Sequence, residues 1–493
     1  MSLHHENALA NALANARANP AAVARIRERI DLTHDASRRA ENYLAESRHR
    51  PIAPSARAIA RLDAFKQPLH DSPIPARDVL AQLDEFASPA TVIQSAGRYF
   101  GYVNGGVEPV AGAAAILAGA WDQNVAMPSQ SPAGAVLDEV AAGWVVDLLG
   151  LPSDAVASFT TGATLANFTA IVAARDALLK RAGWSVEDKG LGGAPALRVI
   201  TGAEVHASVL KSLRMAGIGA AAIERVPVDS AGAIDADFFP ADTDALTLVL
   251  LQAGNVTSGA SDPFARIIPG VRESGGWVHV DGAFGLWAAA SPSRRHLVDG
   301  VDRADSWATD AHKWLNAPYD SGIVIVRDRA DLYRAMAITA PYLATTEARP
   351  LLHLGPHMSQ RARGVETWAL IAARGRHGIA ELIDQSCERA TQFAHLLDAA
   401  GVEILAQPVL NQLPVAFGAA PGQMGDDAIT DEVIASIQRE GTLWASGTVW
   451  KGRKSLRLSV SDAATTADDI EAAALAIIAC WESVLSTPPT PHG

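Results

Sequence analysis

The stretch Ser306-Trp307-Ala308-Thr309-Asp310-Ala311-His312-Lys313-Trp314-Leu315-Asn316 places a lysine directly after a histidine, in an apolar segment flanked by tryptophans. This setting predicts that Lys313 is buried. Buried lysines are rare, because taking an ammonium group out of water is costly and lowers its pKa. A lysine kept in such a place is usually paired with an acid or used as a neutral amine, as in a Schiff base. The alternative is a structural lysine that buries its stem and extends its charged end to solvent.

A second segment, Gly276-Trp277-Val278-His279-Val280-Asp281-Gly282-Ala283-Phe284-Gly285, predicts a short buried strand that ends in an acid. Ligand-binding groups of open α/β sheets gather at the carboxyl ends of strands. An acid at this point can cap a helix, bind a metal together with His279, or pair with a cationic ring nitrogen. Pyridoxal phosphate requires the third role, because a carboxylate keeps its pyridine nitrogen protonated and the ring can then accept electrons. No third metal ligand lies nearby in the sequence, so pairing with a ring is favoured.

A third segment has the character of a phosphate site. Residues 155–159 predict a strand, Thr160-Thr161-Gly162-Ala163-Thr164 a turn, and residues 165–179 a helix. A turn of small residues that leads into a helix presents free N–H groups and the positive end of the helix dipole to an anion. The order of anion turn, acid and lysine therefore predicts a pyridoxal-phosphate site.

With these segments, the chain resembles the pyridoxal-phosphate-dependent group II decarboxylases, the family of the aromatic L-amino-acid and glutamate decarboxylases. The resemblance runs from about residue 98 to residue 461 and implies an α/β fold of pyridoxal-phosphate fold type I, like that of aspartate aminotransferase. The short matches that carry it are Tyr99-Phe100-Gly101-Tyr102, Asp122-Gln123-Asn124-Val125, Ser131-Pro132-Ala133, Thr161-Gly162-Ala163-Thr164-Leu165-Ala166-Asn167, His206-Ala207-Ser208, His279-Val280-Asp281 and Asp310-Ala311-His312-Lys313-Trp314.

The resemblance also implies roles for individual residues. Lys313 becomes the Schiff-base lysine, Asp281 the partner of the pyridine nitrogen, and His206 a ring stacked on the cofactor, although alone His206 is more often a structural histidine. The implied cofactor-binding set is Gly162, Ala163, Thr164, His206, Thr257, Asp281, Ala283, Asp310, His312 and Lys313, with Asp310 or His312 helping the turn to hold the phosphate. The implied reaction is decarboxylation of an L-amino acid to an amine and carbon dioxide.

The chain departs from the family at two places that bear on the product and the substrate. The aromatic decarboxylases return a proton from a tyrosine on a mobile loop, whereas residues 344–353 contain no tyrosine and Tyr342 just precedes them. Reprotonation then falls to His353, which we take as a candidate catalytic residue, or to another group, or oxygen diverts the reaction to an aldehyde. Bulky apolar residues of the family are replaced here, and the predicted substrate residues are Tyr99, Asn124, Ala126, Met127 and Arg457.

Other functions remain open at this point. An aminotransferase shares the lysine and the acid but retains the substrate carboxylate with an arginine; Arg457 is placed for this, although a structural ion pair is at least as plausible for it. An inactive homologue that only binds ligands is a further alternative. Residues 447–455 partly imitate a phosphate loop, but Arg453 stands where the lysine belongs and a strand follows. His353 and His357 have metal-like spacing, yet the intervening Gly-Pro prevents a helical face, and no metal is expected.

Composition fits a large enzyme with a small-molecule substrate. The chain has 493 residues, 49% of them hydrophobic, and a net charge of −13, which argues against nucleic-acid and anionic-membrane partners. Its two cysteines do not suit a disulfide framework, and neither a signal peptide nor a membrane-spanning run is evident. We therefore expect a cytoplasmic location. The resemblance implies a homodimer with the active site near the interface.

The distribution of apolar runs predicts the domain organisation. Residues 1–90 form a helical N-terminal arm, broken by prolines. Residues 91–340 form the large α/β domain, with expected strands at 197–201, 246–252, 278–281 and 322–326. Residues 341–485 form a small α+β domain, with helices at 365–397 and 468–485 and strands at 403–406, 415–417, 442–444 and 456–460. Residues 486–493 form a disordered tail.

Overall fold

The computed structural model describes residues 20–338 and 349–486. The chain divides into two compact units, residues 1–93 and 94–493. Tyr342, residues 344–348 of the segment without tyrosine, and residues 487–493 lie outside the described residues. The domain boundaries and the tail expected from the sequence stay predictions.

The first unit is helical. Its helices are α2 (Pro20–Glu46), α3 (Ala56–Arg61) and α4 (Ala76–Gln82). Helix α2 has 27 residues and buries none of them. Arg39 on α2 pairs with Asp35 one turn earlier and with Asp84 just after α4. Charged contacts rather than an apolar core therefore connect α2 to the rest of this unit.

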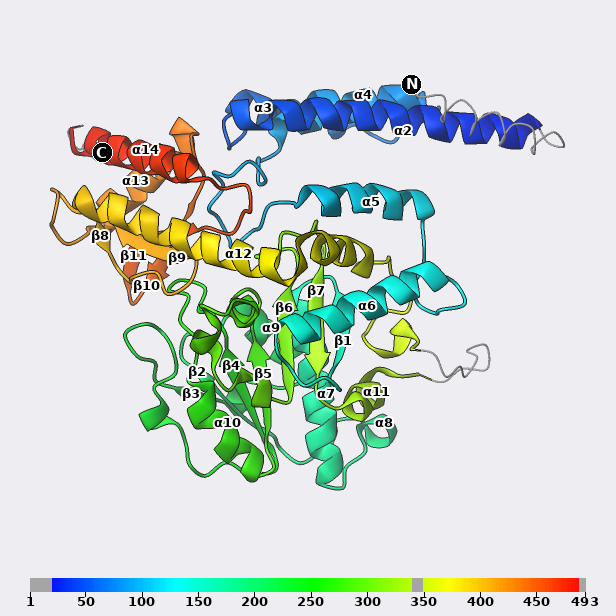
Figure 1. Cartoon of the computed structure of the whole chain (residues 1–493), viewed down its shortest axis with the longest axis vertical. Helices are drawn as coiled ribbons and strands as arrows, with labels where there is room; N and C mark the ends of the chain where they lie inside the picture. The colour runs from blue at the N-terminus through cyan, green and yellow to red at the C-terminus, as the bar shows by residue number, and fades with distance from the viewer. Residues whose placement is uncertain (1–19, 339–348, 487–493) are drawn as a thin grey trace. The chain divides into compact units, whose positions relative to one another are not determined.

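The second unit is built on a sheet of seven strands in the order β1-β7-β6-β5-β4-β2-β3 (Figure 1). The strands are β1 (Val156–Thr160), β2 (Arg198–Gly202), β3 (Ile223–Val226), β4 (Thr247–Gln252), β5 (Trp277–Asp281), β6 (Ser306–Asp310) and β7 (Gly322–Val326). All neighbours are parallel except at β7, which runs antiparallel to both β1 and β6. Strands β4 and β7 are nearly continuous apolar runs, as expected for strands covered on both faces.

Helices cover both faces of this sheet. They are α5 (Pro109–Trp121), α6 (Pro132–Leu148), α7 (Ala163–Arg181), α8 (Val186–Lys189), α9 (Ala207–Met215), α10 (Phe264–Glu273) and α11 (Arg329–Met336). One apolar core joins the sheet to α6, α10 and part of α12, and a second joins the other face to α7, α9 and α11. The sheet is thus the middle layer of a three-layer arrangement, which confirms the α/β class expected from the alternating runs.

A second sheet has the order β10-β11-β9-β8 and is antiparallel throughout. Its strands are β8 (Glu403–Ile404), β9 (Gln412–Ala416), β10 (Ser446–Trp450) and β11 (Arg453–Ser459), and its helices are α12 (Gly364–Ala399), α13 (Asp427–Glu440) and α14 (Ala467–Ser486). Helix α12 is kinked at Gly375, whose φ is 58°. A third apolar core fills this region.

The strand expected at residues 442–444 is wrong. The strand begins at Ser446, and Trp444 instead stacks on Tyr99, with ring centroids 5.0 Å apart. The β10–β11 connection is a two-residue turn in which Lys451 and Gly452 both have positive φ. Such a turn matches the twist of a tight hairpin, so the stretch that partly imitates a phosphate loop is a β-hairpin.

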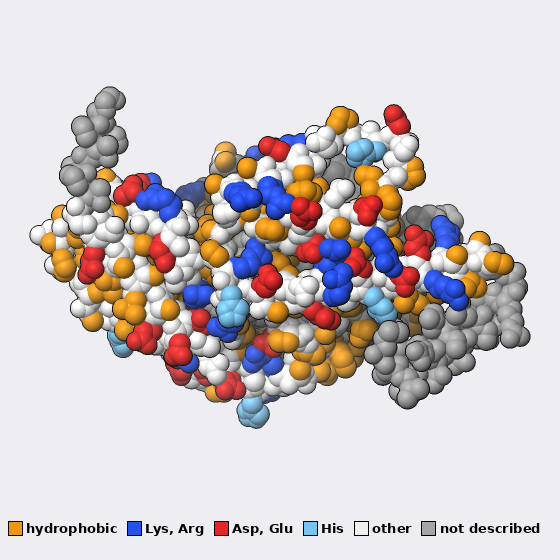
Figure 2. All heavy atoms as spheres, turned by 90° about the horizontal axis from the view of Figure 1, so that it is seen from above, with side chains coloured by type: hydrophobic (Ala, Val, Ile, Leu, Met, Phe, Trp, Pro, Cys, Tyr) orange, Lys and Arg blue, Asp and Glu red, His pale blue; other side chains and the backbone are white. Residues whose placement is uncertain are grey.

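Surface charge is mixed. Figure 2 shows Lys and Arg side chains interspersed with Asp and Glu over the visible face, with hydrophobic side chains between them. Among the residues that the structure describes, no helix is both long and apolar enough to cross a membrane.

Candidate active site

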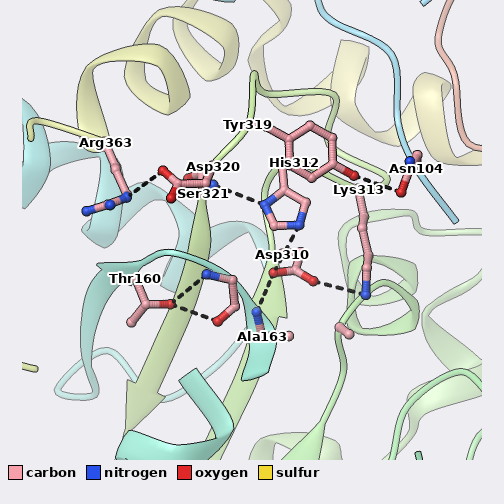
Figure 3. Close-up of polar contacts among 12 residues, drawn as sticks. Asn104, Thr160, Ala163, Asp310, His312, Lys313, Tyr319, Asp320, Ser321 and Arg363 are labelled. Atoms are coloured by element: carbon pink, nitrogen blue, oxygen red, sulfur yellow. Dashed lines mark hydrogen bonds and ion pairs between the residues drawn. The ribbon is translucent and has the colours of Figure 1, made fainter. Parts of the chain in front are cut away.

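Lys313 lies just beyond the carboxyl end of β6, in the turn that leads back to β7. Its neighbour Trp314 is fully buried, whereas the Lys313 side chain keeps 21% of its exposure. The Lys313 Nζ atom lies 3.0 Å from Asp310 Oδ2 (Figure 3). Asn316 anchors this turn from behind, because its buried side chain accepts hydrogen bonds from the N–H groups of Gly106 and Ala463. The lysine is therefore paired with an acid and half-buried on a rigid support.

Asp310 connects the lysine to the start of helix α7. Its Oδ1 accepts a hydrogen bond of 2.6 Å from the Ala163 N–H and lies 3.6 Å from His312 Nε2. His312 Nδ1 accepts a hydrogen bond of 3.0 Å from the Ser321 N–H. Burial lowers the pKa of His312, although the charge of the nearby Asp310 carboxylate raises it. The neutral ring therefore carries its proton on Nε2, and three donors converge on one anionic position.

The turn before α7 packs closely against the start of β7. Thr160 Oγ1 donates to the Gly162 carbonyl at 3.1 Å (Figure 3). A Cβ on Gly322, at the start of β7, would lie 2.4 Å from the backbone of Gly162. Gly322 therefore allows the antiparallel strand to approach the turn, and it brings Gly162 and Ala163 beside Asp310 and His312.

Asp281 ends strand β5 and is almost completely buried. Burial raises the pKa of this carboxyl group, while His206, Lys313 and the Asn167 side chain lower it. Its Oδ1 accepts a hydrogen bond of 3.2 Å from the Ala283 N–H. A carboxylate in this position can interact with a cation that enters the cavity.

His206 is the N-cap residue of α9, and its ring is held by Ser208. The Ser208 Oγ lies 2.7 Å from His206 Nδ1. Burial lowers the pKa of His206, while the charges of Asp281 and Asp310 raise it. The ring is thus fixed in orientation beside the acid expected at the cofactor nitrogen.

A cavity of about 410 Å³ brings these groups together, within the usual size range of ligand sites. Five of the residues expected from the sequence line it, namely His206, Asp281, Ala283, Lys313 and Arg457. Sequence reasoning did not assign a site role to the other lining residues, Tyr102, Val103, Gln252, Gly254, Val256, Phe284, Ser446, Gly447 and Thr448. Tyr102 was visible only as part of a family motif.

Arg457 enters the cavity from strand β11. It is 8% exposed, its Nε has no hydrogen-bond partner, and no described carboxylate lies within ion-pair distance. Burial lowers the pKa of the Arg457 guanidinium, while the phenol groups of Tyr102 and Tyr99 raise it. The structural ion pair considered from the sequence is therefore not formed within the described residues.

Tyr99 lies behind the cavity rather than in its lining. It is 3% exposed and stacks on Trp444, and burial raises its pKa to about 12. Tyr102, three residues later, lines the cavity in a left-handed conformation with φ of 53°.

The remaining expected residues do not line this cavity. Thr257 lies in the adjacent turn, where its N–H donates to Asn255 Oδ1 at 2.8 Å. Asn124 accepts the N–H groups of Ala126 and Gln360, and Met127 follows in the same segment. His353 accepts an N–H from Ile338 at 3.4 Å and packs on Tyr333. Roles for these residues stay predictions.

His279 bonds Asn167 and Ser306 through its two ring nitrogens. The described residues contain no cluster of three His, Cys, Asp or Glu side chains that could hold a metal. In the sequence, Asn167 stands out only as the last residue of a family motif. Its contact with His279 spans 112 positions and is invisible in the sequence.

Comparisons with known proteins agree with this geometry. A family model described as the pyridoxal-dependent decarboxylase conserved domain matches residues 65–417. L-2,4-diaminobutyrate decarboxylase of Acinetobacter baumannii is 28% identical over 320 residues, which cover 60% of this chain and 62% of that protein. Tryptophan decarboxylase 1 of Oryza sativa subsp. japonica is 27% identical over 390 residues, covering 72% of this chain and 73% of the relative.

A crystal structure of Oryza sativa TDC with PLP and tryptamine has the same fold. Its TM-score is 0.85 at 22% identity, and the match covers 92% of this chain and 98% of that one. This likeness confirms fold type I.

The chain belongs to the pyridoxal-dependent decarboxylase family, and the expected enzyme class, a carboxy-lyase that uses pyridoxal phosphate, is confirmed. The residues present fit this cofactor. The start of α7, together with His312, offers donors to a phosphate, Lys313 offers an amine, and Asp281 offers a buried carboxylate.

Proposed function

We propose that the protein decarboxylates an L-amino acid to an amine and carbon dioxide, with Lys313 as the Schiff-base lysine. The observation that carries this proposal is the cavity in which Lys313, Asp281, His206 and Arg457 meet. Bound pyridoxal phosphate supplies an electron sink for the bond that breaks at the substrate α-carbon. The following roles belong to the chain's own groups.

The first turn of α7 and the His312 Nε2–H donate to the phosphate, since a helix N-terminus presents N–H groups and a positive dipole end to an anion. Asp281 keeps the pyridine nitrogen protonated, and the fixed His206 ring stacks on the cofactor. Arg457 holds a carboxylate of the substrate, because a buried guanidinium without an acidic partner favours binding of an anion. Gly162, Thr164, Thr257 and Ala283 complete the proposed contacts.

The test is a screen of L-amino acids for carbon dioxide release by the holoenzyme, with amine, aldehyde and keto acid measured in the same reactions. Carbon dioxide with an amine supports the proposal. A keto acid without carbon dioxide would overturn it in favour of an aminotransferase, the second candidate, which the unpaired Arg457 favours. Carbon dioxide with an aldehyde and peroxide would assign a decarboxylation-dependent aldehyde synthase.

We further propose His353 as the group that returns the proton. The imidazolium form of histidine is a suitable proton donor near neutral pH, and burial lowers the pKa of His353 and so reduces the protonated fraction. The His353→Phe variant should form amine more slowly and yield a larger share of aldehyde and peroxide. An unchanged rate and product ratio would dismiss His353.

We also propose a homodimer. Helix α5 leaves Val110, Ile116, Leu117 and Trp121 exposed, and the predicted substrate residues Asn124, Ala126 and Met127 follow it without lining their own chain's cavity. A second copy would bury this apolar surface and bring that segment near a site.

Sedimentation velocity of Leu117→Asp should show dissociation with loss of activity. Leu475→Asp, at an equally exposed position on α14, is the matched control and should sediment as the wild type does. A fully active monomeric wild type would contradict the dimer. The two cysteines, both buried and free, favour a reducing cytoplasmic location, which stays a prediction.

A further inference from the structure

Behind Asp281 runs a line of buried polar side chains that the proposed chemistry does not use. The Trp277 Nε1–H donates to Ser306 Oγ at 2.9 Å, and Ser306 Oγ lies 2.9 Å from His279 Nδ1. The His279 Nε2 atom lies 2.8 Å from Asn167 Oδ1. Ser306, His279 and Asn167 are all fully buried. The line therefore begins at the Trp277 indole and ends at the Asn167 side chain, before it reaches Asp281.

The direction of each hydrogen bond follows from its neighbours. His279 is neutral, because burial lowers its pKa to about 3, so it carries a single ring proton. Since Asn167 Oδ1 only accepts, that proton lies on Nε2, and Nδ1 accepts from the Ser306 hydroxyl. The tautomer of His279 is fixed at both nitrogens.

The end of the line points to the active site. With Oδ1 engaged by His279, the Nδ2 group of Asn167 is buried and makes no hydrogen bond of ordinary geometry. Asp281 follows His279 by two residues on β5, so both side chains lie on the face of the sheet that Asn167 contacts, and the Asn167 side chain lowers the pKa of Asp281. The opposite orientation would set the amide oxygen against the carboxylate and the amide nitrogen against the histidine proton.

We infer that His279 is a positioning residue: it fixes the Asn167 amide so that Nδ2 faces Asp281 and holds the carboxylate toward the pyridine nitrogen. This inference rests on the proposed role of Asp281. Without the histidine donor, the amide is free to turn over and present its oxygen to the carboxylate. Protonation of the pyridine nitrogen would then lose support, although His279 touches neither cofactor nor substrate.

The test uses holoenzyme loaded with pyridoxal phosphate labelled with 15N in the ring, whose chemical shift reports protonation of that nitrogen. His279→Phe should move the shift toward that of neutral pyridine. It should also lower kcat by about 10-fold to 100-fold, similar to the loss when an outer hydrogen-bond partner of a metal ligand is removed. His279→Gln, which can place an amide nitrogen near the position of Nε2, should recover most of the shift and the rate.

Two further variants guard against a fold defect. Asn167→Leu has nearly the same volume, lacks the amide and should reproduce the shift of His279→Phe. Thr309→Val is the matched control: Thr309 lies on the same strand as Ser306, is equally buried, faces the opposite side of the sheet and should leave shift and rate unchanged.

The outcomes separate the two proposals. If Asp281→Ala leaves the nitrogen shift unchanged, the proposed role of Asp281 fails, and the inference about His279 fails with it. If Asp281→Ala moves the shift but His279→Phe and Asn167→Leu do not, the positioning role alone is overturned. A His279→Gln variant as impaired as His279→Phe would also overturn it.

Discussion

Two cations reach the same cavity from different sheets, and they are treated in opposite ways. Lys313 follows β6 of the large sheet and is paired with Asp310 at 3.0 Å. Arg457 lies on β11 of the small sheet and has no carboxylate partner among the described residues. The charge of the paired cation is balanced by the protein. The unpaired cation is suited to a carboxylate that arrives with the substrate.

Removing the paired cation should have the largest effect. Lys313→Ala should lower kcat/KM by about a thousandfold or more, as expected when a nucleophile is lost. The variant should also lack the linkage that borohydride reduces between protein and cofactor. Lys211→Ala, at an exposed position on α9, is the control. A borohydride-reducible linkage that survives in Lys313→Ala would show that another lysine serves.

Removing Asp281, at the end of β5 in the large sheet, should have the second-largest effect on turnover. Asp281→Ala should still bind the cofactor through the start of α7, but turnover should fall by about a hundredfold or more because the pyridine nitrogen loses its buried partner. Cofactor content and turnover are measured on the same preparation. Near-wild-type turnover would remove Asp281 from the ring nitrogen.

Removing the unpaired cation should act on substrate binding. Arg457→Met should raise KM by about 10-fold to 100-fold, the value of a hydrogen bond to a charged group, and leave cofactor content unchanged. Arg453→Met is the matched control, because Arg453 lies on the same strand and pairs with Glu403 instead. Equal effects of the two changes would end the contrast between Lys313 and Arg457.

Giving Arg457 a partner is a sharper version of this test. Ser446 lies directly opposite Arg457 in the antiparallel β10–β11 pair. Ser446→Asp places a carboxylate beside the guanidinium, and we expect KM to rise by about tenfold through competition with the substrate. Ser446→Asn, which adds similar volume without charge, should have a smaller effect. If both variants behave alike, Arg457 does not hold a substrate carboxylate.

The smallest effect concerns His279, the buried neutral histidine behind Asp281. The pKa of His279 is lowered by burial to about 3, whereas the unfolded value is about 6.5. The unfolded chain therefore binds more protons in this window, and stability falls as pH decreases through it. Between pH 6.5 and 5, the free energy of unfolding of the wild type should fall by roughly 2 kcal/mol relative to His279→Gln.

The comparison with His279→Gln also removes other titrating groups. Burial raises the pKa of Asp262 to about 7, and its contribution has the opposite sign, since the folded chain then binds the extra proton. It acts in both proteins and cancels in the difference. Urea unfolding at the two pH values measures the quantity, and a difference that does not change with pH would contradict a buried neutral His279.

Local patterns were enough to predict the parts of the fold that depend on neighbouring residues. The expected strands at 278–281 and 322–326 agree with β5 and β7 within one residue, and for β7 the signal is a continuous apolar run of the kind that marks a covered strand. The strand expected at 442–444 is wrong: Trp444 forms only an isolated bridge with Tyr99, and β10 begins at Ser446. The tight hairpin turn then depends on Lys451 and Gly452.

The site residues also fall into those that a local sequence pattern predicts and those that depend on partners far along the chain. His206, Asp281 and Lys313 stand in short motifs, and the structure brings them to one cavity. Asn167 and Ser446 gain their importance from partners far along the chain, at His279 and Arg457. No local pattern contains that information. Asn124, Ala126, Met127 and His353 lie outside this chain's cavity lining, and their roles stay predictions.

Gly322 has a consequence for reading mutational data. It touches no reactant, yet any side chain there would collide with Gly162 and push the anion-binding turn away from Asp310 and His312. In a saturation mutagenesis experiment, every substitution at Gly322 should score as badly as changes at Lys313. A map of sensitive positions would therefore mark Gly322 as part of the active site, although it only keeps two backbone segments close together. Cofactor content would distinguish the two positions: Gly322 variants should lose the cofactor, whereas changes at a catalytic residue should slow turnover at full cofactor loading.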